Sequence, residues 1–482
     1  MANGGIIGPV NTPTADVATG VWELEEQYQA QVGGIWPPIP AIGLNSCRFN
    51  SASNDYLTRT PSSASNRKTF TISFWVKRSS VDSSHKNVFS SGTYSSTQMT
   101  QVFFEATDEL IFSDFTSSPS QNFNLTTNRK FRDPSAWYHI FIAVDTTQGT
   151  ASNRIKIYVN GVRETSFSTE AYPSVNFDCA INVNQIHTIG NRNGASLFFD
   201  GYLSEFVFVD GTAQAHTDVG EFDANGFWKP IPLNISAYGT NGFRLNYENA
   251  ANLGEDSSPN GNNFTVNNLT SIDQATDYPV NNYCTWNSVA APYSAPTLSE
   301  GNTKVANNAA NWQGAIGTFG VSQGKWFWEG RFDNTTNTYN HGVIDESVNF
   351  AAINPMNATG YTGFYNADGG EMKKDATDTT ADYGTFGTND IIGIALNMDD
   401  KQISIYKNGS AIVSNFALST TSNLVFPCTV YYSSGICSYN FGNPPYAISS
   451  GNTDGNGYGN FEYAVPSGYL ALNTANLSEV NS

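Results

Sequence analysis

The sequence predicts an all-β fold of two antiparallel sandwiches in series, and three observations lead to this prediction. One turn signature occurs twice, as Ile155–Gly161 and again half a chain later as Ile403–Gly409, with five of the seven positions identical. Each copy alternates apolar and polar residues before Asn-Gly, which accepts the two positive-φ positions of a type I′ hairpin. Glycine is abundant (42 residues) and only 13% of the chain is charged, which suits many short strands joined by turns. A chain of 482 residues also exceeds one compact core, so two or three domains are expected.

Residues 1–42 are predicted to form an N-terminal arm, extended except for one short helix. Within residues 20–32 the apolar positions are three or four apart, and Gly33-Gly34 ends the pattern. So short a helix is marginal alone in water, and its apolar stripe therefore needs a surface. That surface is either the chain's own domain or another subunit, and both alternatives stay open. The candidate docking residues of the arm are Val21, Trp22, Leu24, Tyr28 and Trp36.

Residues 43–225 are predicted to form the first sandwich. Thr69–Lys77 alternates, with Phe70, Ile72, Phe74 and Val76 on one face. Later strands are expected at Trp137–Val144, Ile155–Val159, Ile186–Asn191 and Tyr202–Val209. Residues 226–282, which include one strand-like run at Gly242–Tyr247, are expected to connect the sandwiches.

Residues 283–445 are predicted to form the second sandwich, and residues 446–482 a tail that packs on a domain. Strands are expected at Lys325–Gly330, Asp390–Asn397, Lys401–Lys407, Val425–Tyr432 and Ile436–Phe441. If Ser433–Gly435 turns a hairpin, Cys437 lies opposite Tyr431 and not opposite Cys428.

Charge and cysteine usage exclude several classes of function. The net charge of −19 repels phosphate backbones and anionic lipid, so neither nucleic acid nor a membrane is an expected partner. Five cysteines, an odd number without Cys-x-x-Cys, indicate free and mostly buried thiols. No secretory signal and no 18-residue apolar run is visible.

No catalytic motif stands out, and we expect the protein not to be an enzyme. Retaining glycoside hydrolysis needs two carboxylates on one face, and Glu329–Asp333 has the wrong spacing for that pair. His139 alternates with Trp137 and Phe141, which favours a packed strand residue over a catalytic base. Asp399-Asp400 is interpreted as turn chemistry.

The first domain resembles laminin-G-like, concanavalin A-like jelly rolls. The matching segments are Phe70–Val76, Trp137–Ile140, Ile155–Gly161, Ile189–Asn191 and Asp200–Phe206, in that order. The second domain resembles a SPRY domain in Gly324–Glu329, Gly363–Tyr365, Asp390–Asn397 and Ile403–Gly409. The resemblance implies two tandem concanavalin A-like antiparallel β-sandwiches.

The combination is similar to structural proteins of tailed, marine-type bacteriophages. The run from Gly20 to Pro37, together with Asp256–Phe264 and Pro466–Leu472, resembles segments of such proteins. The resemblance implies a virion surface location, after synthesis in the host cytoplasm. We expect a tail fibre, head fibre or decoration protein that docks on other virion proteins and binds host-surface glycan or protein. A homo-oligomer is expected, a trimer by analogy with fibres.

Two alternatives to receptor binding stay open. The first is a purely structural virion subunit that packs against capsid or tail proteins, and the second is a glycan depolymerase. Loop residues that could contact a ligand are Tyr94, Arg192, Asn193, Tyr365 and Asp368. Laminin-G-like domains often hold Ca²⁺, for which Asp145 and Asp200 are candidates, although turn-capping roles explain both residues. No other cofactor is expected.

Overall fold

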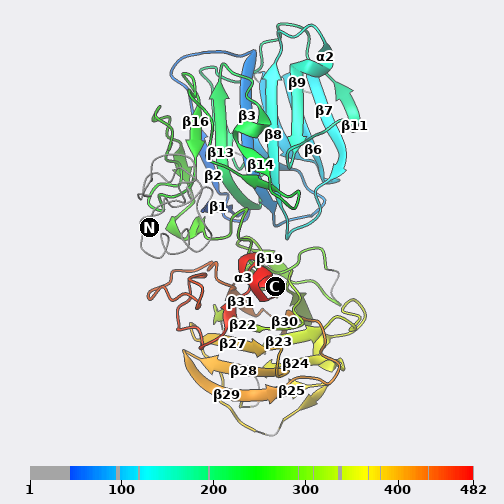
Figure 1. Ribbon diagram of the computed structural model, residues 1–482. Helices are drawn as coiled ribbons and strands as arrows, with labels where there is room; N and C mark the ends of the chain where they lie inside the picture. The colour runs from blue at the N-terminus through cyan, green and yellow to red at the C-terminus, as the bar shows by residue number, and fades with distance from the viewer. Residues whose placement is uncertain are drawn as a thin grey trace, which may run out of the picture. The chain divides into compact units, whose positions relative to one another are not determined.

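The computed structural model describes residues 44–93, 98–117, 120–193, 196–290, 293–307, 309–334, 339–366, 369–379, 381–432 and 434–480. The expected arm with its helix, residues 1–42, lies outside these ranges. From Asn45 onward the chain forms one compact unit. Strands dominate this unit (Figure 1), which confirms the all-β prediction. Within the described ranges, no helix has the length and apolar character that a membrane crossing requires.

Two antiparallel sheets form the first sandwich. Within the described residues, one sheet has the order β10 (Val162–Arg163), β9 (Ile155–Val159), β8 (Trp137–Asp145), β3 (Thr69–Arg78), β13 (Gly201–Asp210), β1 (Ser46–Phe49) and β18 (Gln274–Ala275), with β16 (Phe243–Leu245) beside β13. The other has the order β11 (Phe167–Ala171), β7 (Ser120–Lys130), β6 (Glu109–Ser117), β5 (Met99–Phe104), β4 (Lys86–Ser91), β12 (His187–Ile189), β2 (Tyr56–Arg59) and β17 (Thr265–Asn267). Short helical turns are α2 (Ala151–Arg154), η1 (His216–Asp218) and η2 (Ser271–Asp273).

The period-2 pattern of β3 decides which face is buried. Phe70, Ile72, Phe74 and Val76 all join the core between the two sheets, as predicted. The partner strand β8 runs antiparallel, with Thr69 opposite Asp145 and Lys77 opposite Trp137. Residues of β3 and β8 that point the other way form an outer face.

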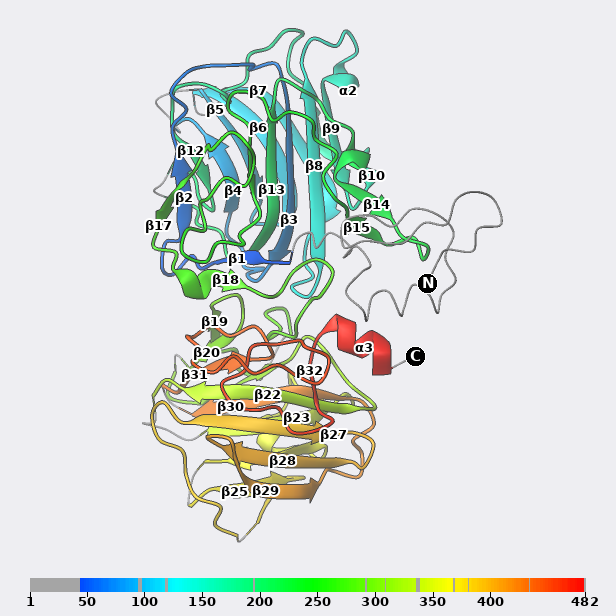
Figure 2. The same cartoon turned by 60° about the vertical axis from the view of Figure 1, so that its left-hand side comes forward.

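Residues 219–238, which we call the strap, cover this outer face. The strap contains a small hairpin of β14 (Gly220–Phe222) and β15 (Trp228–Pro230), which Figure 2 shows beside β10. Its apolar side chains pack on the outer residues of β3, β8 and β13; they are Val219, Trp228, Leu233, Ile235 and Tyr238.

Residues 226–282 do more than connect the two sandwiches. They add β16 to one sheet of the first sandwich, β17 to the other, and β18 beside β1. Phe243, Leu245 and Phe264 join the same core. The first sandwich therefore reaches to residue 275.

The second sandwich also has two sheets. Among the described residues, one has the order β19 (Thr297–Ser299), β20 (Lys304–Ala306), β31 (Ile436–Asn440), β22 (Lys325–Phe332), β27 (Ile391–Asn397), β28 (Gln402–Lys407) and β29 (Ser410–Ala417), with β32 (Leu470–Ala471) parallel to β22. The other has the order β21 (Trp312–Ile316), β30 (Val425–Tyr432), β23 (Tyr339–Asp345), β24 (Tyr361–Tyr365), β25 (Glu371–Lys374) and β26 (Thr377–Asp378). The remaining helical segments are η3 (Pro355–Asn357) and α3 (Thr474–Val480).

The conditional prediction that Cys437 lies opposite Tyr431 is wrong. β30 and β31 belong to different sheets, because the chain crosses from one layer to the other between them. Cys437 therefore faces Val305 and Phe332 in its own sheet. All five cysteines are buried and free, as expected.

Both repeated turns have the predicted geometry. Asn160 and Gly161 have φ values of 48° and 74°, and Asn408 and Gly409 have 48° and 79°. An aromatic ring from a later segment lies over each glycine: Trp228 over Gly161 and Tyr463 over Gly409. A Cβ at Gly161 would lie 2.2 Å from Trp228 Cε3. The two sandwiches therefore share both a hairpin and the way in which its outer side is covered.

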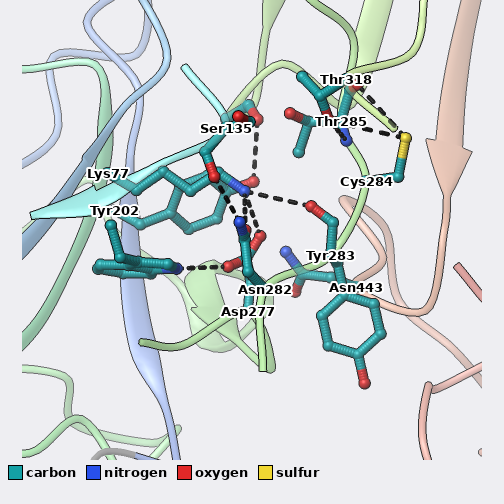
Figure 3. A network of polar contacts seen from close by, with 12 residues as sticks. Lys77, Ser135, Tyr202, Asp277, Asn282, Tyr283, Cys284, Thr285, Thr318 and Asn443 are labelled. Atoms are coloured by element: carbon teal, nitrogen blue, oxygen red, sulfur yellow. Dashed lines mark hydrogen bonds and ion pairs between the residues drawn. The ribbon is translucent and has the colours of Figure 1, made fainter. Parts of the chain in front are cut away.

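A buried polar network holds residues 277–283 against β3 and β8 (Figure 3). Lys77 Nζ donates to Asp277 Oδ2 at 2.7 Å, to Asn282 Oδ1 at 2.6 Å and to the Tyr283 carbonyl at 3.2 Å. The indole Nε1 of Trp137 donates to Asp277 Oδ1 at 2.8 Å. The segment that leaves the first sandwich is thus fixed by charge-assisted hydrogen bonds.

Candidate functional site

A groove of about 520 Å³ opens on the outer face of the first sandwich, next to the strap. It lies between the ends of β8 and β9, the loop that contains α2, and the segment that leads into η1. Its lining comprises Ala143, Asp145, Gln148, Asn153, Lys156, Tyr158, Ala213, Gln214, Ala215 and His216.

The floor of the groove is set by two cross-strand pairs. Ala143 of β8 lies opposite Lys156 of β9, and Phe141 lies opposite Tyr158. Because outward positions alternate with core positions, Lys156 and Tyr158 point out between Ile155, Ile157 and Val159, which are buried. Ala143 has a short side chain, which does not fill the groove.

Tyr158 belongs to a stack of aromatic rings that rigidifies one wall. Its ring is stacked on His216, with centroids 4.2 Å apart and an interplanar angle of 15°. The stack continues from His216 to Trp228, then to His139 and then to Trp75. The ring centroids of these successive pairs are 5.6, 5.9 and 4.8 Å apart. The wall is therefore formed before any ligand arrives.

His139 supports this wall as a neutral residue. Trp228 Nε1 donates to His139 Nδ1 at 3.0 Å, so the proton resides on Nε2, which lies 2.9 Å from Ser73 Oγ. Burial, and to a lesser degree nearby His216, lowers the pKa of His139 to about 3. His139 is thus a packed strand residue, as we interpreted it. Burial also lowers the pKa of His216, against the opposing effect of Asp218.

The rim loop, residues 145–154, is held by its own side chains. Asp145 accepts hydrogen bonds from Thr147 N at 3.1 Å, Thr147 Oγ1 at 2.5 Å and Gln148 Nε2 at 2.5 Å. Burial alone would raise the pKa of Asp145, but these hydrogen bonds outweigh it and the pKa is lowered. Arg154 closes the loop through the carbonyls of Gln148, Gly149 and Pro173 at 2.7–2.8 Å.

Four polar side chains around the groove keep unused hydrogen-bonding capacity. Within the described part of the chain, no hydrogen bond engages the amides of Asn153 and Gln214 or the Tyr158 hydroxyl, and Lys156 has no ion pair. Ala143 contributes no competing polar group. A fixed aromatic wall surrounded by unengaged amide, hydroxyl and ammonium groups is the arrangement that binds a polar ligand with apolar faces.

The calcium candidates occupy separate places. Asp145 lies opposite Thr69 at one end of β3, whereas Asp200 precedes Gly201, which pairs with Arg78 at the other end. Nine residue steps along a strand separate these ends by about 30 Å, so one ion cannot contact both residues. Asp200 also accepts from Ser51 and pairs with Lys86 Nζ at 2.9 Å. Among the described residues, no group of three metal-ligating side chains is present.

The predicted loop residues do not gather at the groove. Arg192 and Asn193 follow β12, where Asn193 N donates to Ser90 Oγ at 3.4 Å. Tyr365 ends β24 in the second sandwich, with Lys373 Nζ 5.9 Å from its ring centroid. Tyr94, Asp368 and the five arm residues lie outside the described residues. Their role as ligand or docking contacts stays a prediction.

Apart from Asp145, which we selected as a calcium candidate, sequence reasoning missed the residues that line the groove, although part of the signal was available. Lys156 and Tyr158 are the outward positions of the first repeated turn signature, so the alternation already placed them at the surface. Gln214 and His216 come from a distant segment, and no local pattern relates them to β9. Their placement depends on how the strap returns over the sheet.

A second hollow, of about 180 Å³, lies among Ser79, Asp82, Asn287, Asn302 and Ala315. Two of its polar side chains are engaged by one carbonyl: Asn302 Nδ2 donates to the Ser79 carbonyl at 2.8 Å, and Ser288 Oγ donates to the same carbonyl at 2.6 Å. These hydrogen bonds connect Ser288 and Asn302 to Ser79, which follows β3. We therefore interpret this hollow as part of a structural contact between segments of the chain.

Comparison with known families agrees with this architecture. Residues 51–217 match the family described as the concanavalin A-like lectin/glucanases superfamily, and residues 325–444 match the SPRY domain family. The chain contains a concanavalin A-like domain and a SPRY domain. Every residue that lines the groove falls within the first match. Together the two domains suggest a binding role.

Individual relatives cover smaller parts. A probable ATP-dependent RNA helicase ddx1 of Dictyostelium discoideum is 29% identical over 143 residues, 29% of this chain and 17% of that protein. Among solved structures, the SPRY domain of human HERC1 is 19% identical (28% of this chain, 87% of that chain, TM-score 0.24). A heptameric SAP-like pentraxin from Limulus polyphemus is 16% identical (47% and 94%, TM-score 0.32), and the TRIM65 PSpry domain is 11% identical (33% and 88%, TM-score 0.27).

Proposed function

We propose that this protein is an appendage of a tailed-bacteriophage virion that binds a host-surface glycan through the groove of its concanavalin A-like domain. The observation that carries the binding proposal is the preformed groove, in which Tyr158 stands beside the unengaged groups of Asn153, Lys156 and Gln214. Sugars combine apolar ring faces with many hydroxyl groups, which matches such a lining. The virion location is supported by the sequence resemblance described above.

In this proposal the arm, residues 1–42, docks the chain on other virion proteins, and copies of the chain assemble as a homo-oligomer. The groove binds without turnover. Its described lining includes one carboxylate, Asp145, and that carboxylate is engaged by Thr147 and Gln148. Retaining or inverting hydrolysis uses a pair of carboxyl groups.

The repeated turn supplies a matched control for a binding experiment. Tyr158 and Tyr406 occupy the same position of the two signatures, but Tyr406 packs near Phe327 and Phe461 on the second sandwich. The full chain is applied to an array of bacterial capsular and lipopolysaccharide glycans. Tyr158→Ala should weaken binding about tenfold or more, as loss of one aromatic contact does, whereas Tyr406→Ala should leave it unchanged. Equal binding by wild type and Tyr158→Ala would refute the groove as the site.

The arm is tested separately. A chain that lacks residues 1–42 should fold and bind glycan but fail to enter particles when it replaces the intact chain during infection. Normal incorporation of the truncated chain would remove the docking role. Release of reducing sugar from a bound glycan would revive the depolymerase.

One observation favours the purely structural alternative. Val162 of β10 and Phe227 of the strap hairpin are 55% and 70% exposed, and Phe222, which contacts the Trp228 ring, is 49% exposed. Exposed apolar side chains of this kind are typical of a protein contact. Substituting all three with Ser should abolish particle incorporation under the structural alternative and spare it under the glycan-binding proposal.

A further inference from the structure

The second sandwich has a separate aromatic surface on the outer face of β21 and β30. Trp312 and Tyr432 are directly opposite each other in the strand register, with ring centroids 5.1 Å apart. Next along the strands, Gly314 lies opposite Val430, and the Phe350 ring packs over Gly314, where an added Cβ would lie 3.6 Å from Phe350 Cζ. Tyr293 and the Asn354-Pro355 turn lie around Trp312 at the same place. We call Tyr293, Trp312 and Tyr432 the aromatic platform.

Hydrogen bonds hold the platform in place. Gly314 N donates to the Ser294 carbonyl at 3.1 Å, and Gln313 Nε2 donates to the Ala295 carbonyl at 2.8 Å. Tyr293 N donates to the Phe350 carbonyl at 2.8 Å. The segment that carries Tyr293 is therefore fixed along the edge strand β21, and the platform needs little ordering when a ligand binds.

The platform is accessible and its polar edges are unengaged. Tyr293 and Tyr432 are 57% and 40% exposed, and Trp312 is half-buried. Within the described residues, no hydrogen bond engages the two hydroxyl groups or the Trp312 indole N–H. Tyrosine and tryptophan rings with free polar edges offer apolar area and hydrogen bonds together.

Charge selects among ligands. The chain carries a net charge of −19, yet the residues gathered around Trp312 are Tyr, Gln, Gly, Asn, Pro and Val, none of which is ionised. An anionic ligand would approach an acidic protein without a cation in the site to receive it. A neutral ligand meets no such penalty.

We infer that the aromatic platform is a second binding site, and that it takes the rings of a neutral saccharide. Its residues belong to the second sandwich and are distinct from those of the groove, so the inference does not depend on the groove. Two weak sites on one chain raise the apparent affinity for a polymeric glycan, because the second contact becomes intramolecular.

The test uses the full chain and calorimetric titration with defined neutral hexasaccharides of glucose, mannose or N-acetylglucosamine, and with hexagalacturonate as the acidic probe. At least one neutral hexamer should bind, and Trp312→Ala should weaken that binding about tenfold or more. Trp312→Tyr should retain most of it. Phe227→Ala, which removes an exposed aromatic side chain from the first sandwich, is the matched control and should change nothing.

The outcomes separate the two sites. Binding that persists in Tyr158→Ala and falls in Trp312→Ala supports the platform. Binding that falls in Tyr158→Ala and is unchanged in Trp312→Ala overturns the platform and leaves the groove intact. Absence of binding by every neutral hexamer, or binding of hexagalacturonate that depends on Trp312, overturns the neutral-saccharide assignment.

Discussion

Lys77 Nζ lies 2.7 Å from Asp277 Oδ2, and the two side chains are 1% and 0% exposed. Burial raises the pKa of Asp277, while Lys77 and the Trp137 indole oppose that shift. The pair connects β3 to a residue 200 positions later, at the point where the chain leaves the first sandwich. The packing of that segment therefore depends on this buried ion pair and on the hydrogen bonds around it.

Asp277→Asn should destabilise the protein by about 3–5 kcal/mol, because it leaves the Lys77 ammonium charged and buried without its counter-ion. Urea unfolding followed by tryptophan fluorescence measures the change. Lys77→Met combined with Asp277→Leu removes both charges and should recover most of the loss. A double variant no more stable than Asp277→Asn would show that the carboxylate acts mainly through its hydrogen bond from Trp137.

Ala143→Leu should block the groove without unfolding the domain. The side chain of Ala143 projects onto the groove floor and not into the core between the sheets, so a leucine there extends into the space for a ligand. Glycan binding should weaken about tenfold or more while the melting temperature changes little. Ala143→Ser keeps the depth of the groove and should bind like wild type. Unchanged affinity for Ala143→Leu would place the ligand elsewhere.

Glu329 should make stability depend on pH near neutrality. Its carboxylate is buried and accepts from Glu462 N at 3.0 Å and Tyr463 N at 2.9 Å. Burial dominates and raises the pKa of Glu329 from 4.5 to about 7. A raised carboxyl pKa contributes stability that is complete below pH 4.5 and is lost as the pH rises through 7. Relative to Glu329→Gln, wild type should lose up to about 3 kcal/mol between pH 5 and 8.

The difference between the two chains isolates Glu329 from other titrating groups. Burial also raises the pKa of Asp55 to about 7, which acts in the same direction, whereas it lowers that of His341 to about 3, which acts in the opposite direction. Both contributions cancel in the comparison. If the free energy of unfolding changed with pH in the same way for wild type and Glu329→Gln, the raised pKa of Glu329 would be contradicted.

Gly161→Ala should cost more than Gly226→Ala, although both glycines have positive φ, 74° and 82°. Each substitution places an L residue in the left-handed region, at about 1 kcal/mol. Gly161 also lies beneath Trp228, whereas a Cβ at Gly226 meets nothing within 4 Å. Thermal unfolding of both variants measures the excess, which reports the contact between the strap and the repeated hairpin. Equal losses would mean that Trp228 moves aside freely.

The five thiols should not react with thiol reagents in the native protein. All five are buried, and burial raises the pKa of Cys428 and Cys437 well above the ordinary thiol range. A disulfide-exchanging reagent such as DTNB should therefore label none of them until denaturant is added, when all five react. Rapid labelling of the folded protein would reveal local opening.

Much of the fold followed from local pattern. The alternation in Thr69–Lys77 and the Asn-Gly signature after Ile155 each specify a buried face or a turn within a few residues, and both were predicted correctly. The strand Val425–Tyr432 was predicted with its observed bounds. What failed needed long-range information. Whether the chain after Tyr432 turns back or crosses to the other sheet depends on which strand edge is free, and that is not a local property.

The groove shows the same limit. The outward positions Lys156 and Tyr158 could be identified from alternation, but the ring that stacks on Tyr158 comes from His216, which follows β10, β11, β12 and β13 in the sequence. The loop residues that we selected instead, such as Arg192 and Tyr365, satisfied only a general expectation about loops. A pair of segments that meet only after folding cannot be recognised from either one alone.

The late strands β16, β17 and β18 also define what can be transplanted. A fragment that stops at residue 217, where the family match ends, would lack all three and leave the edges of β13, β2 and β1 with unpaired backbone groups. Unpaired strand edges of this kind promote aggregation between copies of the fragment. The exchangeable module is therefore the stretch from Asn45 to Asp277, which forms the ion pair with Lys77, and not the shorter family match of residues 51–217. This holds for recombination in nature and for grafting onto another scaffold.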